Sequence, residues 1–224
     1  MLKENVKLIN KNGIHFQIDD SGKLIHYQSW KGNAVAFCYD WIMDKILMPK
    51  KLAADNNKHY SILKNMLKYE HGKKVLELAA GSGSAEYFLP ADNLYSGSDV
   101  SLALLKRAVK KLTGYFTSSK FYLMSADDLV FSNDQFDLIL CVLSLNFFPD
   151  LPKAVNEMQR VLIPGGKIVC CVPVSNRNHN NAKINGDIYT EKELENFFTD
   201  AGFSFHLNPC SNGAILYFSA VKVT

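Results

Sequence analysis

Residues 74–84 read Lys-Val-Leu-Glu-Leu-Ala-Ala-Gly-Ser-Gly-Ser, and this stretch decides the expected fold. Its first half is the short apolar run of a buried strand, interrupted by one carboxylate, Glu77. Its second half is a turn in which Gly81 and Gly83 carry no β-carbon. Such a turn lets a ligand lie against the main chain, where free N–H groups at the start of the next helix can bind it. The stretch therefore predicts a nucleotide-like site at a strand–turn–helix junction.

The residues around the turn indicate which kind of nucleotide fits. A dinucleotide-binding turn needs a third glycine where this chain has Glu86. A phosphate-binding loop needs Gly-Lys followed by Ser or Thr, which the turn lacks. Glu77 instead places a negative charge at the strand end, which suits a cationic nucleoside without phosphate groups. S-adenosylmethionine is such a ligand.

Further motifs carry a family resemblance. Residues 75–83 resemble the first motif of class I S-adenosylmethionine-dependent methyltransferases, with Ala79 in the place of a frequent first glycine. Segments that follow in the family's order are residues 95–101, 125–129, 136–141 and 160–166. The resemblance covers residues 71–224 and is strongest to the branch with ubiquinone/menaquinone-type and other small-molecule methyltransferases. It implies S-adenosyl-L-methionine as cofactor and a small-molecule acceptor as partner.

Strand and helix patterns alternate from residue 73 onward, which favours a doubly wound α/β sheet. The resemblance implies a Rossmann-like sheet of seven strands with the last strand antiparallel. The strand candidates are residues 74–79, 94–98, 120–124, 136–143, 166–173, 203–208 and 214–222. Asp150 is expected to cap a helix over 151–162, and Thr190 with Glu193 matches a capping box. The asparagine-rich stretch 175–185 is expected to be a loop or lid.

Residues 1–70 are expected to form a separate unit, an N-terminal hairpin and helical cap, before the methyltransferase core of residues 71–224. Residues 14–18 and 23–27 flank turn residues and predict a β-hairpin. Residues 34–48 predict a helix that ends at Pro49, and residues 56–68 predict another. We expect this segment to cover the acceptor side of the site, or alternatively only the sheet edge. Its aromatic wall would come from Phe37, Tyr39, Trp41 and Tyr60.

The resemblance assigns the cofactor to the carboxyl ends of the strands, near the point where strand order reverses. Gly81 and Gly83 would let its methionine and ribose parts approach the backbone, and Ser82 would add polar contacts. The alternative for the glycines is tight strand–helix packing. Asp99, at the end of the second strand, would accept hydrogen bonds from both ribose hydroxyls, with helix capping as its alternative. On this view, loss of Asp99 leaves the stability of the unliganded protein almost unchanged.

Other cofactor contacts are less specific. Glu77 is expected either to meet the cofactor's amino group, directly or through water, or to orient the glycine turn. Ser125 and Ala126 match the family position that reads the adenine edge, but many relatives have Asp or Asn at the first, so Asp127 is an alternative reader. Val142 would form an apolar wall near the adenine. The expected cofactor-binding residues are Glu77, Ala79, Gly81, Ser82, Gly83, Asp99, Val100, Ser125, Ala126, Asp127 and Val142.

The expected reaction needs little from catalytic side chains. Methyl transfer from a sulfonium is an in-line displacement, so alignment supplies much of the acceleration. A base is needed only if the acceptor must lose a proton, and the sequence indicates none. Asn146 or Phe147 would face the acceptor, unless their role is structural, and the aromatic wall suits a small, partly hydrophobic molecule. The alternative function is a non-catalytic S-adenosylmethionine-binding regulatory or interaction protein.

The charge of the chain bears on the class of partner it could bind. The net charge of +3 across 224 residues gives no support to a nucleic acid partner. Four basic residues, at positions 106, 107, 110 and 111, predict a solvated helix face or contact with an anionic partner.

Five cysteines without a Cys-x-x-Cys pair argue against a disulfide framework and a zinc site, so we expect no metal and a reduced, cytoplasmic setting. No apolar run approaches the roughly 18 residues of a membrane span. These patterns carry no signal for the oligomeric state.

Overall fold

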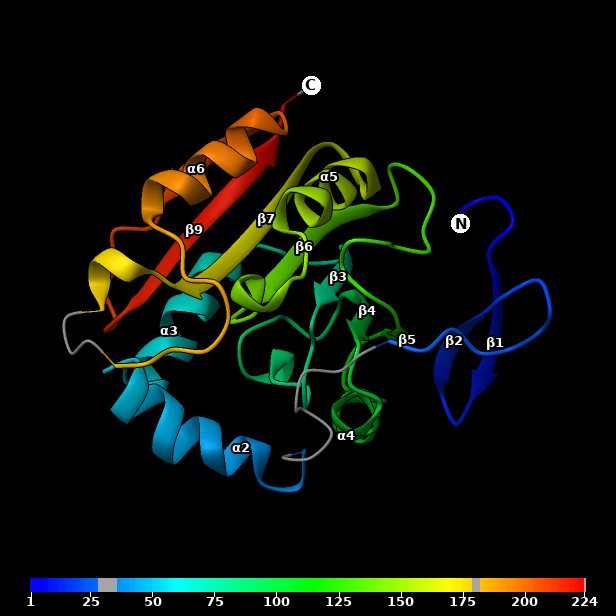
Figure 1. The fold of residues 1–224 in the computed structure, drawn as a ribbon, viewed down its shortest axis with the longest axis horizontal. Coiled ribbons are helices and arrows are strands. Elements are labelled where there is room, and N and C mark those ends of the chain that lie inside the picture. Colours follow the sequence, from blue (N-terminus) through cyan, green and yellow to red (C-terminus); the bar gives the residue numbers. More distant parts are fainter. Residues whose placement is uncertain (28–35, 179–181, 224) are drawn as a thin grey trace.

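A mixed sheet of nine strands lies at the centre of the structure, a computed structural model that describes residues 1–27, 36–178 and 182–223 (Figure 1). The order across the sheet is β1-β2-β5-β4-β3-β6-β7-β9-β8. The strands are β1 (Lys7–Lys11), β2 (Ile14–Ile18), β3 (Lys74–Leu78), β4 (Leu94–Asp99), β5 (Ser118–Leu123), β6 (Phe136–Val142), β7 (Leu162–Pro173), β8 (Phe203–Leu207) and β9 (Ile215–Lys222). The main helices are α2 (Tyr39–Ile42), α3 (Asn56–Leu67), α4 (Leu102–Leu112), α5 (Leu151–Val161) and α6 (Glu191–Asp200). Shorter helical segments are η1 (Ala36–Cys38), η2 (Met43–Lys51), η3 (Ala85–Tyr87), η4 (Leu145–Phe147) and η5 (Ser175–Arg177).

The seven predicted strands are present as β3 to β9, and the doubly wound α/β class is confirmed. Strand β9 runs antiparallel to both β7 and β8, as expected for the last strand. The predicted count of seven is wrong for the sheet as a whole, because the N-terminal hairpin joins it. Strand β2 pairs in parallel with β5, with Ile14 opposite Phe121. The hairpin is thus an extension of the core sheet.

The hairpin itself forms one strand earlier than predicted. Strands β1 and β2 are joined by Asn12 and Gly13, which have φ angles of 54° and 79°. Positive φ at both positions is the requirement of the tight type I′ turn, and Asn-Gly is its favoured sequence. The predicted turn at Asp19 also exists, since its carboxylate accepts the N–H of Ser21 at 2.8 Å. Beyond this turn the chain forms a single isolated β-bridge, between Ile18 and Leu24, and no strand. The predicted strand over residues 23–27 is therefore wrong.

Three helical segments in succession, η1, α2 and η2, form the first part of the cap, and α3 forms the second. The predicted start at residues 34 and 35 lies outside the described residues. The predicted end at Pro49 is wrong, because η2 continues through it to Lys51 in wide π turns. Proline lacks an N–H and its ring clashes with the carbonyl one α-turn earlier, and a wider turn relieves the clash. The predicted second helix is confirmed, with Asp55 as its N-cap.

Helices cover both faces of the sheet (Figure 1). Alternate residues of the central strands point to opposite sides, so Leu76 and Leu78 belong to the apolar cluster under α5 and α6, whereas Val75 belongs to the one under α3 and α4. Both predicted caps are present, at Asp150 and Thr190. Strand β3 lies beside β6 as well as β4, so the order reverses at its carboxyl end. In doubly wound sheets this is where ligands bind.

Candidate functional site

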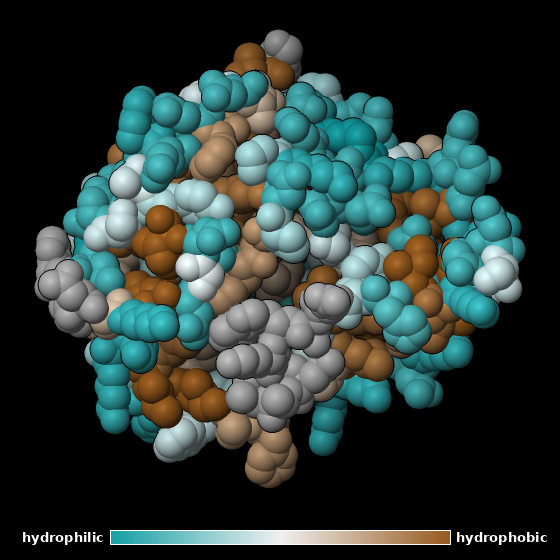
Figure 2. All heavy atoms as spheres, viewed as in Figure 1, coloured by the Kyte–Doolittle hydropathy of each residue, from teal (hydrophilic) through white to brown (hydrophobic). Residues whose placement is uncertain are grey.

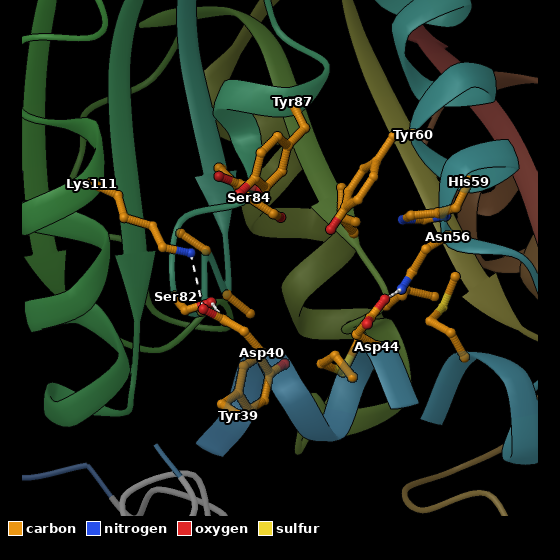
Figure 3. A pocket seen from close by; sticks show the side chains of 18 of the residues that line it. Tyr39, Asp40, Asp44, Asn56, His59, Tyr60, Ser82, Ser84, Tyr87 and Lys111 are labelled. Atoms are coloured by element: carbon orange, nitrogen blue, oxygen red, sulfur yellow. Dashed lines mark hydrogen bonds and ion pairs between the residues drawn. The ribbon is translucent and has the colours of Figure 1, made fainter. Parts of the chain in front are cut away.

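A cavity of about 300 Å³ lies at the carboxyl edge of the sheet, where the strand order reverses (Figure 3). Its volume is at the lower end of the range for small-molecule sites. The turn after β3 and the end of β6 form one side, and the cap forms the other. The lining residues are Tyr39, Asp40, Met43, Asp44, Met48, Asn56, Asn57, His59, Tyr60, Glu77, Ala79, Ala80, Gly81, Ser82, Ser84, Tyr87, Lys111, Val142 and Leu143. They include five of the expected cofactor residues: Glu77, Ala79, Gly81, Ser82 and Val142.

The two glycines of the turn face different neighbours. Gly81 has a φ of 56°, and a β-carbon there would lie 3.8 Å from Cε1 of Tyr39, on the cavity side. Gly83 has a φ of 83°, and its β-carbon would lie 2.9 Å from Cα of Ala108 in α4. That distance is shorter than real β-carbon contacts, so Gly83 allows close helix packing, as the alternative interpretation stated. Ala79 also has positive φ, at 52°, which accounts for glycine being frequent at this position in the family.

Glu77 lies buried at the floor of the cavity. Its carboxylate accepts a hydrogen bond from the hydroxyl of Tyr95. Burial raises the pKa of Glu77 to about 7, against the opposing hydrogen bond from Tyr95, and the nearby charge of Asp99 adds to the rise. In the described part of the chain, no lysine or arginine forms an ion pair with Glu77. A cation bound in the cavity would therefore supply the charge partner that this carboxylate lacks.

Asp99 lies at the end of β4, beneath the glycine turn. One carboxylate oxygen accepts the N–H of Gly81 at 2.8 Å and the other accepts the N–H of Ser101 at 2.7 Å. Burial raises the pKa of Asp99, although these backbone hydrogen bonds oppose the rise. Ser101 caps α4 by accepting the N–H of Leu104, so Asp99 is not needed for that cap. Asp99 thus holds the turn in shape, and each oxygen keeps a second lone pair for a ligand hydroxyl.

The residues expected at the adenine edge lie outside the cavity. The Ser125 hydroxyl donates to the carboxylate of Asp127 in the turn after β5, and Ala126 between them is buried. Burial raises the pKa of Tyr27 to about 12, and the charges of Asp128 and Asp127 add to the rise. The cofactor roles of all the expected residues stay predictions, as does the division of the chain into residues 1–70 and 71–224.

Asp40 connects the cap to the glycine turn and to α4. Its carboxylate accepts hydrogen bonds from the hydroxyl of Ser82, from Nη2 of Arg107 at 2.6 Å and from Nζ of Lys111 at 3.1 Å. Burial opposes ionisation, but these three donors lower the pKa of Asp40 below its ordinary value. Half of the basic face of α4 is therefore bound to the cap, so the solvated-face interpretation holds only for Lys106 and Lys110, which are exposed. No local pattern in the sequence marks Asp40, because its partners lie far along the chain.

The predicted aromatic wall is half correct. Tyr39 and Tyr60 line the cavity, and Tyr60 lies beside Tyr87 with ring centroids 5.1 Å apart. Phe37 and Trp41 do not line it: their exposed fractions are 95% and 59%. Along this helix only one side faces the sheet, and these two residues lie on the other.

Asn146 and Phe147, expected to face the acceptor, do not line the cavity either. Asn146 is buried, and its Nδ2 donates to the carbonyl oxygen of Asn185 at 2.6 Å. The main-chain carbonyl oxygen of Asn146 accepts the N–H of Asp187 at 2.8 Å. Asn146 therefore holds the end of the asparagine-rich loop against η4, which is the structural alternative. Residues 179–181 of that loop lie outside the described residues.

His59 adds a polar group to the cap side of the cavity. Its Nδ1 lies 2.8 Å from the hydroxyl of Tyr217, and burial lowers the pKa of His59 to about 4. Nδ2 of Asn212 donates to the same hydroxyl at 3.2 Å. A buried hydroxyl must also donate, and His59 is the acceptor within reach among the described contacts. Nδ1 therefore accepts and the proton resides on Nε2, which makes His59 a hydrogen-bond donor toward a ligand.

We expect a nitrogen-15 spectrum of the His59 ring to show protonated Nε2 and unprotonated Nδ1, with no titration between roughly pH 5 and 8. Tyr217→Phe removes the hydroxyl that fixes the ring and should shift the tautomer balance. A proton found on Nδ1 of His59, or a midpoint near neutrality, would contradict this assignment.

Comparison with known proteins agrees with this geometry. A family model described as a methyltransferase domain matches residues 76–170. The chain carries a methyltransferase domain. The match runs from β3 into β7 and contains the glycine turn, Glu77 and Asp99, so the resemblance to class I S-adenosylmethionine-dependent methyltransferases is confirmed.

A curated relative of this domain is the ubiquinone/menaquinone biosynthesis C-methyltransferase of Rickettsia felis, 34% identical over 105 residues. That alignment covers 43% of this chain and 42% of the relative, so the chain spans less than half the length of the curated protein it matches.

Solved structures share the fold of the methyltransferase domain at low identity. One is the complex of the Haloferax volcanii Trm112 methyltransferase activator with a methyltransferase, at 18% identity and a TM-score of 0.69, covering 88% of this chain and all of that one. Another is an S-adenosylmethionine-dependent methyltransferase from Methanosarcina mazei, at 19% identity and a TM-score of 0.59, covering 72% of this chain and 97% of that one.

Three further features of the described residues bear on the methyltransferase domain. No group of three or more His, Cys, Asp or Glu side chains in residues 1–27, 36–178 and 182–223 could hold a metal ion. No helix in those ranges combines the length and the apolar character needed to cross a membrane. All five cysteines have free thiols, and those at positions 141, 170 and 171 are buried.

Proposed function

We propose that this protein transfers a methyl group from S-adenosylmethionine to a small, partly hydrophobic acceptor bound between the glycine turn and the cap. This proposal rests on one observation: a single cavity brings together Glu77, the bare backbone at Gly81 and the aromatic cap residues Tyr39 and Tyr60. The buried carboxylate favours a cationic cofactor, and the bare turn allows it to lie against the main chain.

The cap side of the cavity suits the acceptor. Met43, Met48 and the paired rings of Tyr60 and Tyr87 offer apolar contacts, while His59 offers a hydrogen-bond donor. An acceptor with an aromatic ring and an oxygen substituent fits this mixture. The relative from Rickettsia felis is named as a quinone-biosynthesis methyltransferase, so demethylated quinone precursors are the first acceptors to test.

The reaction needs only alignment and exclusion of water. The acceptor atom attacks the sulfonium methyl carbon as the sulfur–methyl bond breaks, which yields the methylated acceptor and S-adenosylhomocysteine. Where the acceptor atom carries a proton, that proton leaves to solvent or to a nearby base. Closure of the cap through Asp40, Ser82 and α4 would hold the reactants in line and keep bulk water out.

The test is transfer of a labelled methyl group from S-adenosylmethionine into fractionated cell extract, scored separately for small molecules, RNA and protein. Asp99→Ala protein serves as the control for background transfer. We expect label in a small-molecule fraction together with S-adenosylhomocysteine. Label confined to RNA or protein would overturn the proposed acceptor class, and cofactor binding without S-adenosylhomocysteine in any fraction would favour the non-catalytic alternative.

Cofactor affinity should depend on pH through Glu77. Its pKa is about 7 in the free protein, and the cofactor's ammonium group would lower it, so binding below pH 7 must displace a proton. The dissociation constant should therefore rise as pH falls below 7, by up to about tenfold per pH unit. Titration calorimetry from roughly pH 5.5 to 7.5, where the ammonium stays charged, measures this. Glu77→Gln should bind weakly with little pH dependence, and an equally steep profile in that variant would exclude Glu77 as the titrating group.

A further inference from the structure

The outer face of the cap carries aromatic side chains that nothing in the proposed reaction uses. Phe37 and Trp41 are four residues apart, so they lie on one side of the helical segment η1–α2, and both are largely exposed. Between them, Tyr39 and Asp40 point the other way, into the site (Figure 3). Soluble proteins seldom expose a phenylalanine and a tryptophan on the same side of one helical segment, so this pair indicates a contact surface.

Basic residues flank this aromatic pair at both ends. Lys45, Lys50 and Lys51 follow along the same helix and are exposed. At the other end, Nη1 of Arg107 donates to the carbonyl oxygen of Phe37 at 3.2 Å, which brings the basic face of α4 beside the aromatic pair.

Lys106 and Lys110 on that face of α4 are exposed as well. Asp44 offsets part of the charge through its ion pair with Lys45, at 2.9 Å. Figure 2 shows apolar side chains interrupting the polar surface along the lower edge, where the cap lies.

We propose that this surface, consisting of Phe37, Trp41 and the flanking lysines, binds a membrane that contains anionic lipids. A helix that lies in the interface buries Phe and Trp among the acyl chains and places lysines at the headgroup level. A groove for single-stranded nucleic acid instead interleaves aromatic and basic residues along a track. Here the aromatic pair occupies one end of a helix and the lysines surround it, which fits a flat, anionic surface.

The placement relates the surface to the cavity without depending on the proposed reaction. The same short helix presents Phe37 and Trp41 outward and Tyr39 and Asp40 inward. A membrane bound by the outer face would lie next to the rim of the cavity, so a lipid-soluble molecule would reach the site without crossing bulk water.

The experiment is cosedimentation of the full chain with phosphatidylcholine vesicles, with and without phosphatidylglycerol. We expect binding to the anionic vesicles that weakens at high salt, and little binding to phosphatidylcholine alone. In Trp30→Phe protein, Trp41 is the remaining tryptophan, and its fluorescence should shift to the blue with anionic vesicles. Phe37→Ser and Trp41→Ser should each reduce the partition coefficient by roughly tenfold or more.

Tyr69→Ser is the matched control. Tyr69 is 81% exposed and lies under the ammonium group of Lys68, but it precedes β3 and so occupies the opposite edge of the sheet. This variant should bind vesicles as the unaltered chain does. The assay contains neither cofactor nor acceptor, so its outcome is independent of methyl transfer. Absence of vesicle binding, unchanged binding in the Phe37→Ser/Trp41→Ser double variant, or binding to RNA in place of vesicles would overturn the proposal.

Discussion

Asp99→Ala should weaken the binding of S-adenosylmethionine and S-adenosylhomocysteine alike, by roughly tenfold to more than a hundredfold. Both ligands carry the same ribose, so loss of a carboxylate that accepts its hydroxyls affects them equally. The structure adds a second reason. Without Asp99, the N–H of Gly81 loses its 2.8 Å acceptor, and the turn that receives the cofactor loses its support. Titration calorimetry with each ligand measures the effect.

The same geometry changes the expected stability of the unliganded variant. The sequence alone predicts almost no change in stability, but alanine would leave the buried N–H groups of Gly81 and Ser101 without acceptors. Each unsatisfied donor costs on the order of 1–3 kcal/mol, so a clear fall in stability is now expected. Chemical denaturation without ligand would show it.

Two further variants separate the roles of Asp99. Asp99→Asn keeps one acceptor oxygen but turns an amide toward the other N–H, so it should fall between the parent and alanine in both assays. Asp127→Ala should weaken the cofactor less, because the Asp127 carboxylate accepts from Ser125 and, unlike Asp99, does not hold the N–H of Gly81 in the glycine turn. If Asp99→Ala bound the cofactor as tightly as the parent, the ribose assignment would be wrong.

Gly83→Ala should destabilise the fold by about 2–4 kcal/mol. A non-glycine residue at positive φ costs about 1 kcal/mol, and forcing a methyl group into a packed interior adds about 1–3 kcal/mol. The new β-carbon would lie 2.9 Å from the main chain of α4 and 3.1 Å from Cγ of Leu112, so the helix has to move. Urea denaturation measures the free energy of unfolding directly.

The control for this variant is Gly114→Ala. Gly114 has nearly the same φ, 86°, but nothing lies within 4 Å of the β-carbon position. It should therefore show only the backbone cost of about 1 kcal/mol. Equal destabilisation of the two variants would mean that close packing against α4 is not what position 83 requires.

Elements with strong local patterns were predictable from sequence. Strands β3, β6 and β7 are apolar on both faces, and Asp150 and Thr190 cap their helices through contacts that span three residues. The glycine turn could be predicted for the same reason, because the residues that define it are consecutive in the sequence. Glu77 and Asp99 could be predicted as site residues because each lies at the end of a recognisable strand.

Features that depend on distant contacts were not predictable. Asp40 gains its role from Ser82, Arg107 and Lys111, which lie 42, 67 and 71 residues away. The exposure of Phe37 and Trp41 depends on which side of a helix meets the sheet, and residue type alone suggested burial. The position of the hairpin has a different origin: two turn sequences, Asn12-Gly13 and the longer one at Asp19, lie close together, and the strands form around the first.

The pairing of β2 with β5 has a consequence for the order of folding. Ile14 of β2 can pair with Phe121 of β5 only after residue 121 has been synthesised. Closing so long a loop is slow compared with forming the local helices. Until β2 and β5 pair, the outer edge of β5 stays open. We expect the N-terminal segment to be the last part of the chain to become protected from hydrogen exchange during refolding, after the central strands. A chain stalled before residue 121 would expose Phe16 and its neighbours to chaperones.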